Sequence, residues 1–298
     1  MKTKNIKKKF KSNKNFGKTK TEKVLVWISF TVFLIHSISL ILPLAWGLIS
    51  SFKSGALEYF QDPFALPKQW NFSNYITAVK VLETNDVGFV EMVINSLWFA
   101  GGSALFSVAV TSVCAYVFAR YDFPFKKVLF TFSVFLMIIP VYGALPAQYD
   151  FYGRLGIKNS PLILVTALGC FGTSNFLIMT SYFRNLAKDY KDAAMVDGAN
   201  DFTAFFRVML PQTKGMVLSF FMLQFMASWN DYYSPMIFLD KMPTLSSGLF
   251  TYQTITMRMG NYPIYFAGVF ISCIPIVILY SCMHNVVVKN MSFGGLKG

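Results

Sequence analysis

The sequence predicts an all-α membrane protein with six transmembrane helices and with both termini in the cytoplasm. Three observations predict this class: an apolar composition, six apolar segments of sufficient length, and basic residues gathered on one side of them. Of the 298 residues, 54% are hydrophobic and only 14% are charged, whereas soluble domains usually carry about 25% charged residues. The mean hydropathy is +0.47.

The six apolar segments are close to the roughly 20 residues that a membrane-spanning helix needs. They lie at residues 24–50, 92–119, 128–147, 161–183, 216–239 and 265–288. The first is too long for the core of a signal peptide, about 7–15 residues, so we expect it to be retained. The third is the least regular, because Pro140, Gly143 and Pro146 interrupt its outer end. Irregular backbone is tolerated there only where protein or a water-filled cavity covers it.

The basic residues determine the orientation, because cytoplasmic loops are enriched in Lys and Arg. With both ends inside, the inner segments hold 20 of the 27 Lys and Arg and the outer segments hold seven. The inner segments are 1–23, 120–127, 184–215 and 289–298, and the outer ones are 51–91, 148–160 and 240–264. Ten basic residues lie in 1–23 alone, which we interpret as a disordered basic tail. No RNA-binding motif accompanies it, so no nucleic-acid partner is predicted.

A charged cytoplasmic loop, residues 184–215, separates the fourth and fifth segments, and its centre reads DAAMVDGANDFTAFFRVMLP (192–211). A helical face at i, i+4, i+7 and i+8 is formed by Leu186, Tyr190, Ala193 and Ala194. Gly198 follows, where a helix can end in the left-handed conformation that glycine adopts without a Cβ clash.

A second short helix is predicted after this glycine. Asn200 is a good N-cap, and Asp201 suits the positive end of a helix. An apolar face is formed by Phe202, Phe205, Phe206 and Met209, and Pro211 is expected to end the helix. Two amphipathic helices at an angle either rest on the lipid headgroups or dock a partner. The small side chains of Ala193 and Ala194 would allow a partner to approach closely.

The same stretch resembles the permease subunits of binding-protein-dependent ABC importers. That family carries E-A-A, three residues, Gly, nine residues and I-x-L-P. Its places are occupied here by Asp192, Ala193, Ala194, Gly198, Leu210 and Pro211, with Asp192 in place of Glu and Val208 in place of Ile. Asn95-Ser96 and the runs AYVFARYDFPFKK (115–127), SWND (228–231) and GGLKG (294–298) are similar to the second permease subunit of the maltose-type carbohydrate branch.

The resemblance covers roughly residues 24–298 and implies an importer transmembrane domain in the bacterial cytoplasmic membrane. In that family the loop helix is the coupling helix, seated in a cleft of a cytoplasmic ATPase. The implied docking residues are Asp192, Ala193, Ala194, Asp197, Gly198, Leu210 and Pro211. The implied partners are a homologous second permease, two ATPase subunits that carry ATP and Mg²⁺, and an extracytoplasmic binding protein that delivers a sugar or oligosaccharide.

A candidate substrate path lies in the outward half of the fifth segment, at Trp229, Asn230, Asp231, Tyr232 and Tyr233. Aromatic faces stack on sugar rings, and Asn and Asp hydrogen-bond to hydroxyl groups. An interfacial aromatic belt with a capped helix break before Pro235 is the alternative. Two further ionisable side chains lie in the segments, His36 and His284, and we expect packed or interfacial positions for both.

Several chemistries find no signature in the sequence. There is no GxxxxGK[ST] loop for ATP, no plausible catalytic Ser/His/Asp or Cys/His set, and no CxxC spacing among the four cysteines. We therefore predict no enzyme activity, no metal and no cofactor on this chain. The scarcity of charge within the segments favours a neutral polyhydroxylated substrate over a proton relay. A uronate oligosaccharide or glycerol phosphodiester remains an alternative substrate, and a polytopic membrane enzyme or secondary carrier an alternative class.

Overall fold

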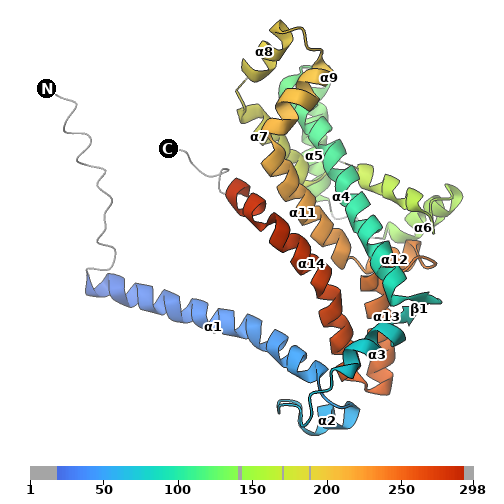
Figure 1. Ribbon diagram of the computed structural model, residues 1–298. Coiled ribbons are helices and arrows are strands. Elements are labelled where there is room, and N and C mark those ends of the chain that lie inside the picture. Colours follow the sequence, from blue (N-terminus) through green and yellow to red (C-terminus); the bar gives the residue numbers. More distant parts are fainter. Residues whose placement is uncertain (1–18, 140–142, 170, 188, 292–298) are drawn as a thin grey trace.

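The computed structural model describes residues 19–139, 143–169, 171–187 and 189–291. This part of the chain is almost entirely helical (Figure 1), apart from two short antiparallel strands, Glu83–Thr84 (β1) and Val87–Gly88 (β2). The longer helices are α1 (Lys20–Ser51), α4 (Phe89–Arg120), α5 (Lys126–Ile138), α7 (Ser174–Asn185), α11 (Lys214–Asn230), α13 (Leu245–Met259) and α14 (Tyr262–Met291). The shorter ones are α2 (Ala56–Gln61), α3 (Ser73–Val81), α6 (Leu145–Arg154), α8 (Asp189–Val196), α9 (Asp201–Thr203), α10 (Leu210–Gln212) and α12 (Tyr233–Phe238). A 3₁₀ helix covers Pro161–Leu168 (η1) and a π-helical turn covers Ala204–Met209 (η2).

Three of these helices are long and apolar enough to cross a membrane: α1, α4 and the stretch Tyr262–Cys282 of α14. The other three predicted segments are each divided. Segment 128–147 forms α5 and the start of α6, segment 161–183 forms η1 and most of α7, and segment 216–239 forms most of α11 and then α12. The described part of the chain therefore contains fewer continuous spanning helices than the apolar pattern predicts.

Local residues explain each division. Gly143 has φ +78° and Pro146 lies in the first turn of α6, as expected for an interrupted third segment, whereas Pro140 lies outside the described residues. Gly172, with φ +75°, separates η1 from α7. Asp231 ends α11 in an extended conformation, and its Oδ1 accepts hydrogen bonds from the backbone N–H groups of Tyr233 and Ser234, both 3.0 Å, at the start of α12.

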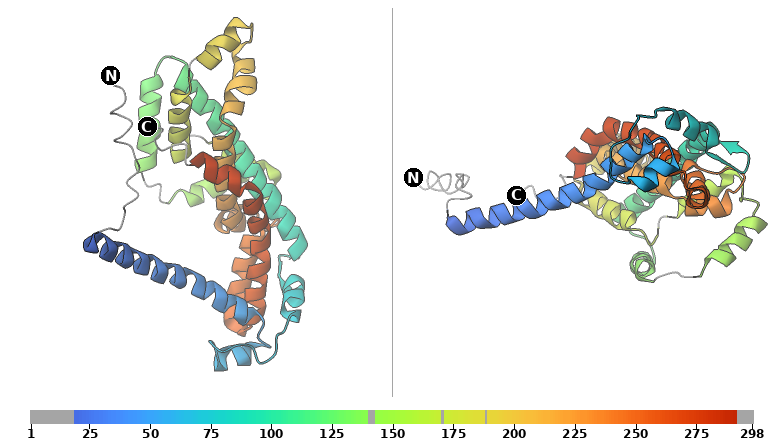
Figure 2. Two further views of the ribbon diagram at one scale, coloured as in Figure 1. Left: turned by 60° about the vertical axis from the view of Figure 1, so that its left-hand side comes forward. Right: turned by 90° about the horizontal axis from the view of Figure 1, so that it is seen from below.

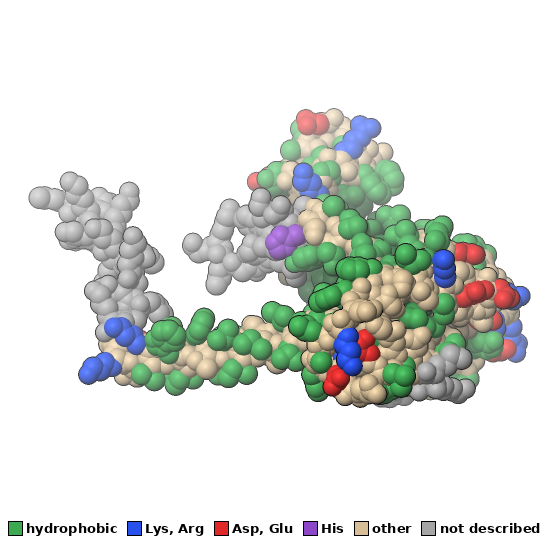
Figure 3. All heavy atoms as spheres, turned by 60° about the horizontal axis from the view of Figure 1, so that its bottom comes forward, with side chains coloured by type: hydrophobic (Ala, Val, Ile, Leu, Met, Phe, Trp, Pro, Cys, Tyr) green, Lys and Arg blue, Asp and Glu red, His purple; other side chains and the backbone are tan. Residues whose placement is uncertain are grey.

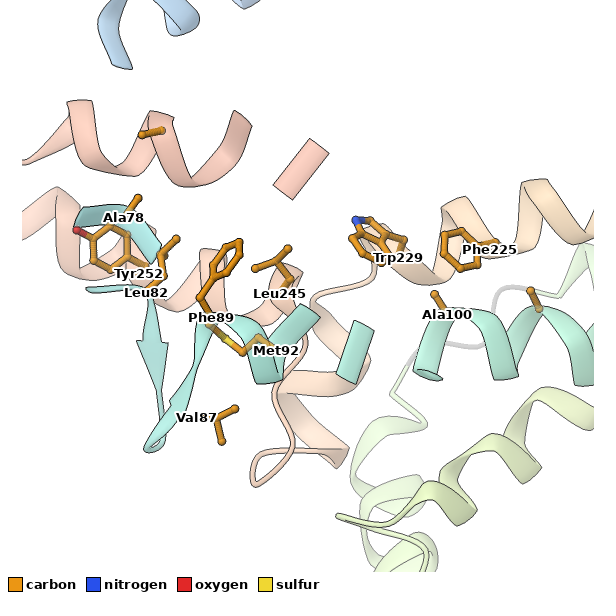
Figure 4. Close-up of a cluster of buried hydrophobic side chains, with 12 residues drawn as sticks. Ala78, Leu82, Val87, Phe89, Met92, Ala100, Phe225, Trp229, Leu245 and Tyr252 are labelled. Carbon is orange, nitrogen blue, oxygen red and sulfur yellow. The ribbon is translucent and has the colours of Figure 1, made fainter. Parts of the chain in front are cut away.

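Helix α4 is the centre of the bundle and packs against α11, α7 and η1, while α11 also packs against α14. Gly102 faces η1, where an added Cβ would lie 2.5 Å from Leu164 Cδ1. One cluster of buried side chains, which includes Met92, Phe225 and Trp229, joins α4, α11 and α13 (Figure 4). A second cluster around Tyr116 joins α4, α7 and η2.

Helix α1 leaves the bundle at its C-terminal end and projects away from the other helices (Figures 1 and 2). Its buried residues are confined to that end: Gly47, Ser50 and Ser51. A Cβ at Gly47 would lie 3.6 Å from the Phe270 ring of α14. Exposed apolar side chains are spread along the rest of α1 (Figure 3), as expected for a helix surrounded by lipid or by another apolar surface.

The segment after α1 is organised around a buried lysine. Lys53 is 0% exposed, and its ammonium donates hydrogen bonds to the carbonyl oxygens of Asp62 (2.5 Å) and Pro63 (2.9 Å). The Asn74 side chain donates to the carbonyls of Ser51 and Lys53 at 2.7 and 2.8 Å. This segment lies at the end of the molecule opposite α8 (Figure 1).

Candidate functional site

The loop between α7 and α11 lies at one extreme end of the molecule, where α8 and α9 form a turn-connected pair (Figure 1). Gly198 has φ +85°, so the prediction of a left-handed residue is confirmed. The Gly198 N–H donates to the Met195 carbonyl (3.1 Å) and the Ala199 N–H to the Ala194 carbonyl (2.9 Å). These bonds satisfy carbonyl groups at the end of α8.

The start of the second helix also agrees with its prediction. The Asn200 side chain accepts a hydrogen bond of 2.8 Å from the Thr203 N–H, as an N-cap does. The prediction that Pro211 ends this helix is wrong, because helical residues continue through Pro211 to Gln212, and Thr213 alone separates them from α11. Proline lacks the N–H of an interior helix residue. The π turn η2 lies immediately before α10, where the α-helical hydrogen-bond pattern is already interrupted.

The residues predicted to dock an ATPase fall on two elements: Asp192, Ala193, Ala194, Asp197 and Gly198 lie on α8 and the turn after it, whereas Leu210 and Pro211 lie on α10 beside the start of α11. Asp192, Ala193, Asp197, Gly198 and Pro211 are exposed. Ala194 is buried, and Leu210 is half-buried and packs against the cluster around Tyr116. The exposed surface also holds Val196 and Phe202, which are 88% and 70% exposed. The prediction omitted both, although large apolar side chains in a cytoplasmic loop are the signal that could have found them.

An ionic and aromatic contact ties this loop to the end of α4. The Tyr121 hydroxyl donates to Asp201 Oδ1, and Lys191 Nζ lies 3.2 Å from the same oxygen. Lys191 Nζ also lies 3.9 Å from the centre of the Tyr121 ring. The hydrogen bond from Tyr121, followed by the one from Lys191, lowers the pKa of Asp201. Burial raises the pKa of Tyr121, and its hydrogen bond to Asp201 adds to that shift.

Buried rings continue the contact toward the bundle. Tyr116 of α4 packs against Phe205 of η2, with ring centres 4.7 Å apart, and against Phe183 of α7 at 5.6 Å. Phe205 and Met209 are buried, as the predicted apolar face requires, whereas Phe202 and Phe206 remain exposed and contact each other. The loop is therefore packed against α4 and is covalently continuous with α11.

The five predicted path residues separate into different environments. Trp229 is 3% exposed and stacks on Phe225 at 5.7 Å within the buried cluster (Figure 4), so its ring faces the interior of the chain. Asn230 is exposed and its side chain donates to the Met226 carbonyl. Tyr232 stacks on Phe250 with ring centres 4.4 Å apart, and Tyr233 is half exposed.

Asp231, alone among these five, lines a cavity of about 260 Å³ between α4, α6, η1 and the α11–α12 junction. Polar side chains line it with Asp231: Ser103, Gln148, Thr166, Gln224, Ser228 and Ser234. The sequence prediction missed these residues. Their signal was available, because Gln224, Ser228 and Asp231 lie at i, i+4 and i+7 and place one polar stripe on an apolar helix.

The two histidines lie on exposed surfaces of α1 and α14, and His284 Nδ1 is 2.9 Å from the Tyr280 hydroxyl oxygen. Among the described residues, no group of three or more His, Cys, Asp or Glu side chains could hold a metal ion.

Comparison with known proteins identifies the class. Residues 107–293 match the family described as binding-protein-dependent transport system inner membrane component, so the chain belongs to that family and is a permease subunit. Membership excludes the polytopic enzyme and secondary carrier considered above.

Individual relatives match along most of their length. The diacetylchitobiose uptake system permease protein NgcG of Streptomyces coelicolor is 29% identical over 277 residues, which cover 90% of this chain and 87% of that protein. The arabinooligosaccharides transport system permease protein AraQ of Halalkalibacterium halodurans is 26% identical, covering 94% and 100%. A crystal structure of a bacterial ABC transporter that imports the acidic polysaccharide alginate has the same fold, with a TM-score of 0.74, 20% identity, and coverage of 90% and 98%.

Proposed function

We propose that this chain is one transmembrane subunit of an ATP-driven importer that moves a sugar or oligosaccharide into the cytoplasm. The observation that carries the proposal is the α8–α9 pair, which has the family's motif residues, an exposed tip and a packed connection to α4 and α11. The names of the relatives support the substrate class, because they transport diacetylchitobiose and arabinooligosaccharides.

Partner subunits supply ATP hydrolysis in this proposal. The exposed Asp192, Ala193 and Asp197 form the docking surface for a cytoplasmic ATPase that holds ATP and Mg²⁺. A homologous second permease would dock a second ATPase in the same way, and an extracytoplasmic binding protein would deliver the sugar at the opposite end, beside the segment around Lys53.

Movement of the docked ATPase would reach the bundle by two routes. The contacts of Asp201 and Lys191 with Tyr121 transmit it to the end of α4. The continuous helix through η2 and α10 transmits it to α11. Because α4 and α11 pack against each other and both line the cavity at Asp231, displacement of the loop would change the space along these two helices.

The proposed topology has six membrane passages with both ends inside. Helices α1, α4 and α14 provide three continuous passages, and the divided segments provide the others where neighbouring elements cover the breaks. The excess of basic residues on the loop side supports this orientation. A reporter that is active only in the cytoplasm, fused after residue 298, should be active. Activity of an external reporter at that position would contradict both the topology and the position of the docking loop.

The function is tested by sugar uptake in cells that carry the chain with its sister permease, binding protein and ATPase. Deletion of this chain should abolish uptake, and the ATPase should co-purify with it from membranes. Failure of any P-loop ATPase to co-purify through residues 184–215 would contradict the importer assignment. Of the predicted path residues, Asn230, Asp231, Tyr232 and Tyr233 remain candidates for sugar contact, and their alanine variants should lower uptake without releasing the ATPase.

A further inference from the structure

The cavity at Asp231 brings together several polar side chains from α4, α6, η1 and the α11–α12 junction. Some buried hydroxyl groups elsewhere donate to the carbonyl of their own helix: Ser112 to Val108, Thr180 to Phe176 and Ser219 to Gly215. This local bond is the usual state of Ser and Thr inside a helix. Among the described residues, the hydroxyls of Ser50, Thr84, Tyr116 and Thr256 are buried without a partner. The side chains of Ser103 and Ser234 line the cavity.

Of the remaining polar groups, the Thr166 hydroxyl donates to the Ile163 carbonyl at 2.7 Å, whereas Asp231 and Gln224 are incompletely engaged. Asp231 uses Oδ1 to cap α12, and no described residue donates to its Oδ2. Gln224 makes one long contact of 3.4 Å with the Ser228 hydroxyl. Because these groups face a cavity, water or a ligand with several hydroxyl groups can complete their hydrogen bonds.

The charge of the lining is as informative as its polarity. Asp231 is the one carboxylate among the residues that line the cavity, and Lys, Arg and His are absent from that set. A carboxylate on a ligand would therefore meet a like charge with no compensating cation. Apolar surfaces for the C–H face of a sugar ring are provided by Phe99, Tyr152 and Phe238.

The size limits what can enter. At about 260 Å³, the cavity is at or below the lower end of the roughly 300–1,000 Å³ that enclose a drug-sized ligand. It suits one sugar ring of a longer chain.

From these observations we infer that the cavity lined by Ser103, Gln224, Ser228 and Asp231 binds one ring of a neutral sugar during import and disfavours uronate residues. The inference rests on the proposed function and extends it, since that function leaves neutral and acidic sugars open.

Cysteine labelling of the full importer in membranes tests this inference and does not require the transported sugar to be identified. In a background with all four native cysteines replaced by serine, Ser103→Cys and Ser234→Cys are treated with cationic (trimethylammonioethyl) and anionic (sulfonatoethyl) methanethiosulfonates. Both positions should react, the cationic reagent several-fold faster, and Asp231→Asn should remove this preference. Ser219→Cys is the matched control, because it lies on α11 outside the cavity lining and is buried, so it should stay unlabelled. Absence of labelling at both cavity positions, or equal rates with the two reagents, would overturn the inference.

The ligand class is tested by protection of Ser103→Cys. Millimolar diacetylchitobiose should slow its labelling several-fold, whereas digalacturonate should not. Slowing by digalacturonate to the same degree, or by neither sugar, would also overturn the inference. These outcomes are separate from the proposed function, because retention of the ATPase on the same membranes reports the importer assembly independently of the cavity.

Discussion

The hydroxyl of Tyr121 donates a hydrogen bond to the carboxylate of Asp201, 80 positions further along the chain. Lys191 contacts the same oxygen at 3.2 Å. One atom, Asp201 Oδ1, thus joins the end of α4 to both helices of the docking loop. The contact makes the loop part of the bundle at the point where the proposed ATPase force would enter.

Tyr121→Phe removes the hydroxyl donor and keeps the ring under Lys191. We expect uptake to fall several-fold while the ATPase still co-purifies, because the docking surface stays intact but its connection to α4 is weakened. Tyr190→Phe is the matched control, since Tyr190 lies in the same loop and is 46% exposed. Equal uptake by the two variants would show that this hydrogen bond carries no coupling.

The same contact predicts a pH dependence of stability. The pKa of Asp201 in the folded chain lies below its ordinary value of 3.8. Its contribution to stability is therefore fully present above the ordinary value and is lost as the pH falls through the folded value. The Tm difference between wild type and Asp201→Asn in detergent should be constant from about pH 8 to pH 6 and should shrink below about pH 4. A difference that persists unchanged to the lowest pH would contradict the assignment.

Replacement of Gly198 should strain the backbone without causing a steric clash. A Cβ at Gly198 would meet nothing within 4 Å, so the left-handed φ of +85° is the sole source of strain. Gly198→Val should cost on the order of 1–2 kcal/mol, displace α8 from α9 and abolish uptake. Gly198→Asn should keep most uptake, because asparagine tolerates this conformation. If valine and asparagine behave alike, the geometry of the turn does not matter for coupling.

Asp192 tests the charge of the docking surface. Asp192→Lys should weaken co-purification of the ATPase, because it reverses an exposed charge, whereas Asp192→Glu should be nearly silent because it keeps the charge. Binding of the ATPase to both variants at wild-type level would remove Asp192 from the docking surface.

Two adjacent glycines on α4, Gly101 and Gly102, allow one substitution to serve as the control for the other in a test of packing. A Cβ at Gly102 would lie 2.5 Å from Leu164 Cδ1, whereas one at Gly101 meets nothing within 4 Å. Gly102→Ala should destabilise the chain by about 1–3 kcal/mol through overpacking against η1, and Gly101→Ala should leave stability unchanged or slightly raised. Thermal unfolding of the two purified variants measures the difference. Equal Tm values would indicate that η1 can move away freely.

Replacement of Lys53 should destabilise the segment between α1 and α3. Lys53→Met preserves the length of the side chain but removes its two charge-assisted hydrogen bonds, so that the Asp62 carbonyl keeps the Ala65 N–H (3.3 Å) and the Pro63 carbonyl keeps Trp46 Nε1–H (2.8 Å). We expect a loss of about 1–3 kcal/mol and faster proteolysis between α1 and α3. Lys68→Met is the control, because the Lys68 side chain is exposed. The hydrogen bond from Lys68 to Glu58 comes from the backbone N–H, which the substitution keeps. Proteolysis at the same rate in both variants would contradict the role of the buried ammonium.

The sequence predicted best where the signal is local. Gly198 and Asn200 act through their own backbone and the next few residues, so their roles could be inferred from neighbours alone. Pro211 was misjudged because the π turn before it appears in no propensity or periodicity. Trp229 carried an ambiguous signal, since an aromatic ring suits a sugar path and a buried cluster equally well. The burial of Lys53 could not be predicted from the sequence, because lysine is almost never fully buried and because the fold positions the carbonyl groups that it contacts.

The π turn Ala204–Met209 affects how α8 and α9 are rotated about the helix axis relative to α11. A π turn holds an additional residue compared with an α-helix, and each α-helical residue rotates the chain by about 100° and advances it by about 1.5 Å. Loss of one residue from this turn would therefore rotate α8 and α9 by about a quarter of a circle relative to the face of α11 that carries Gln224 and Ser228. The number of residues in the turn, more than their identity, sets the direction in which a push on the loop is applied to the helix below it.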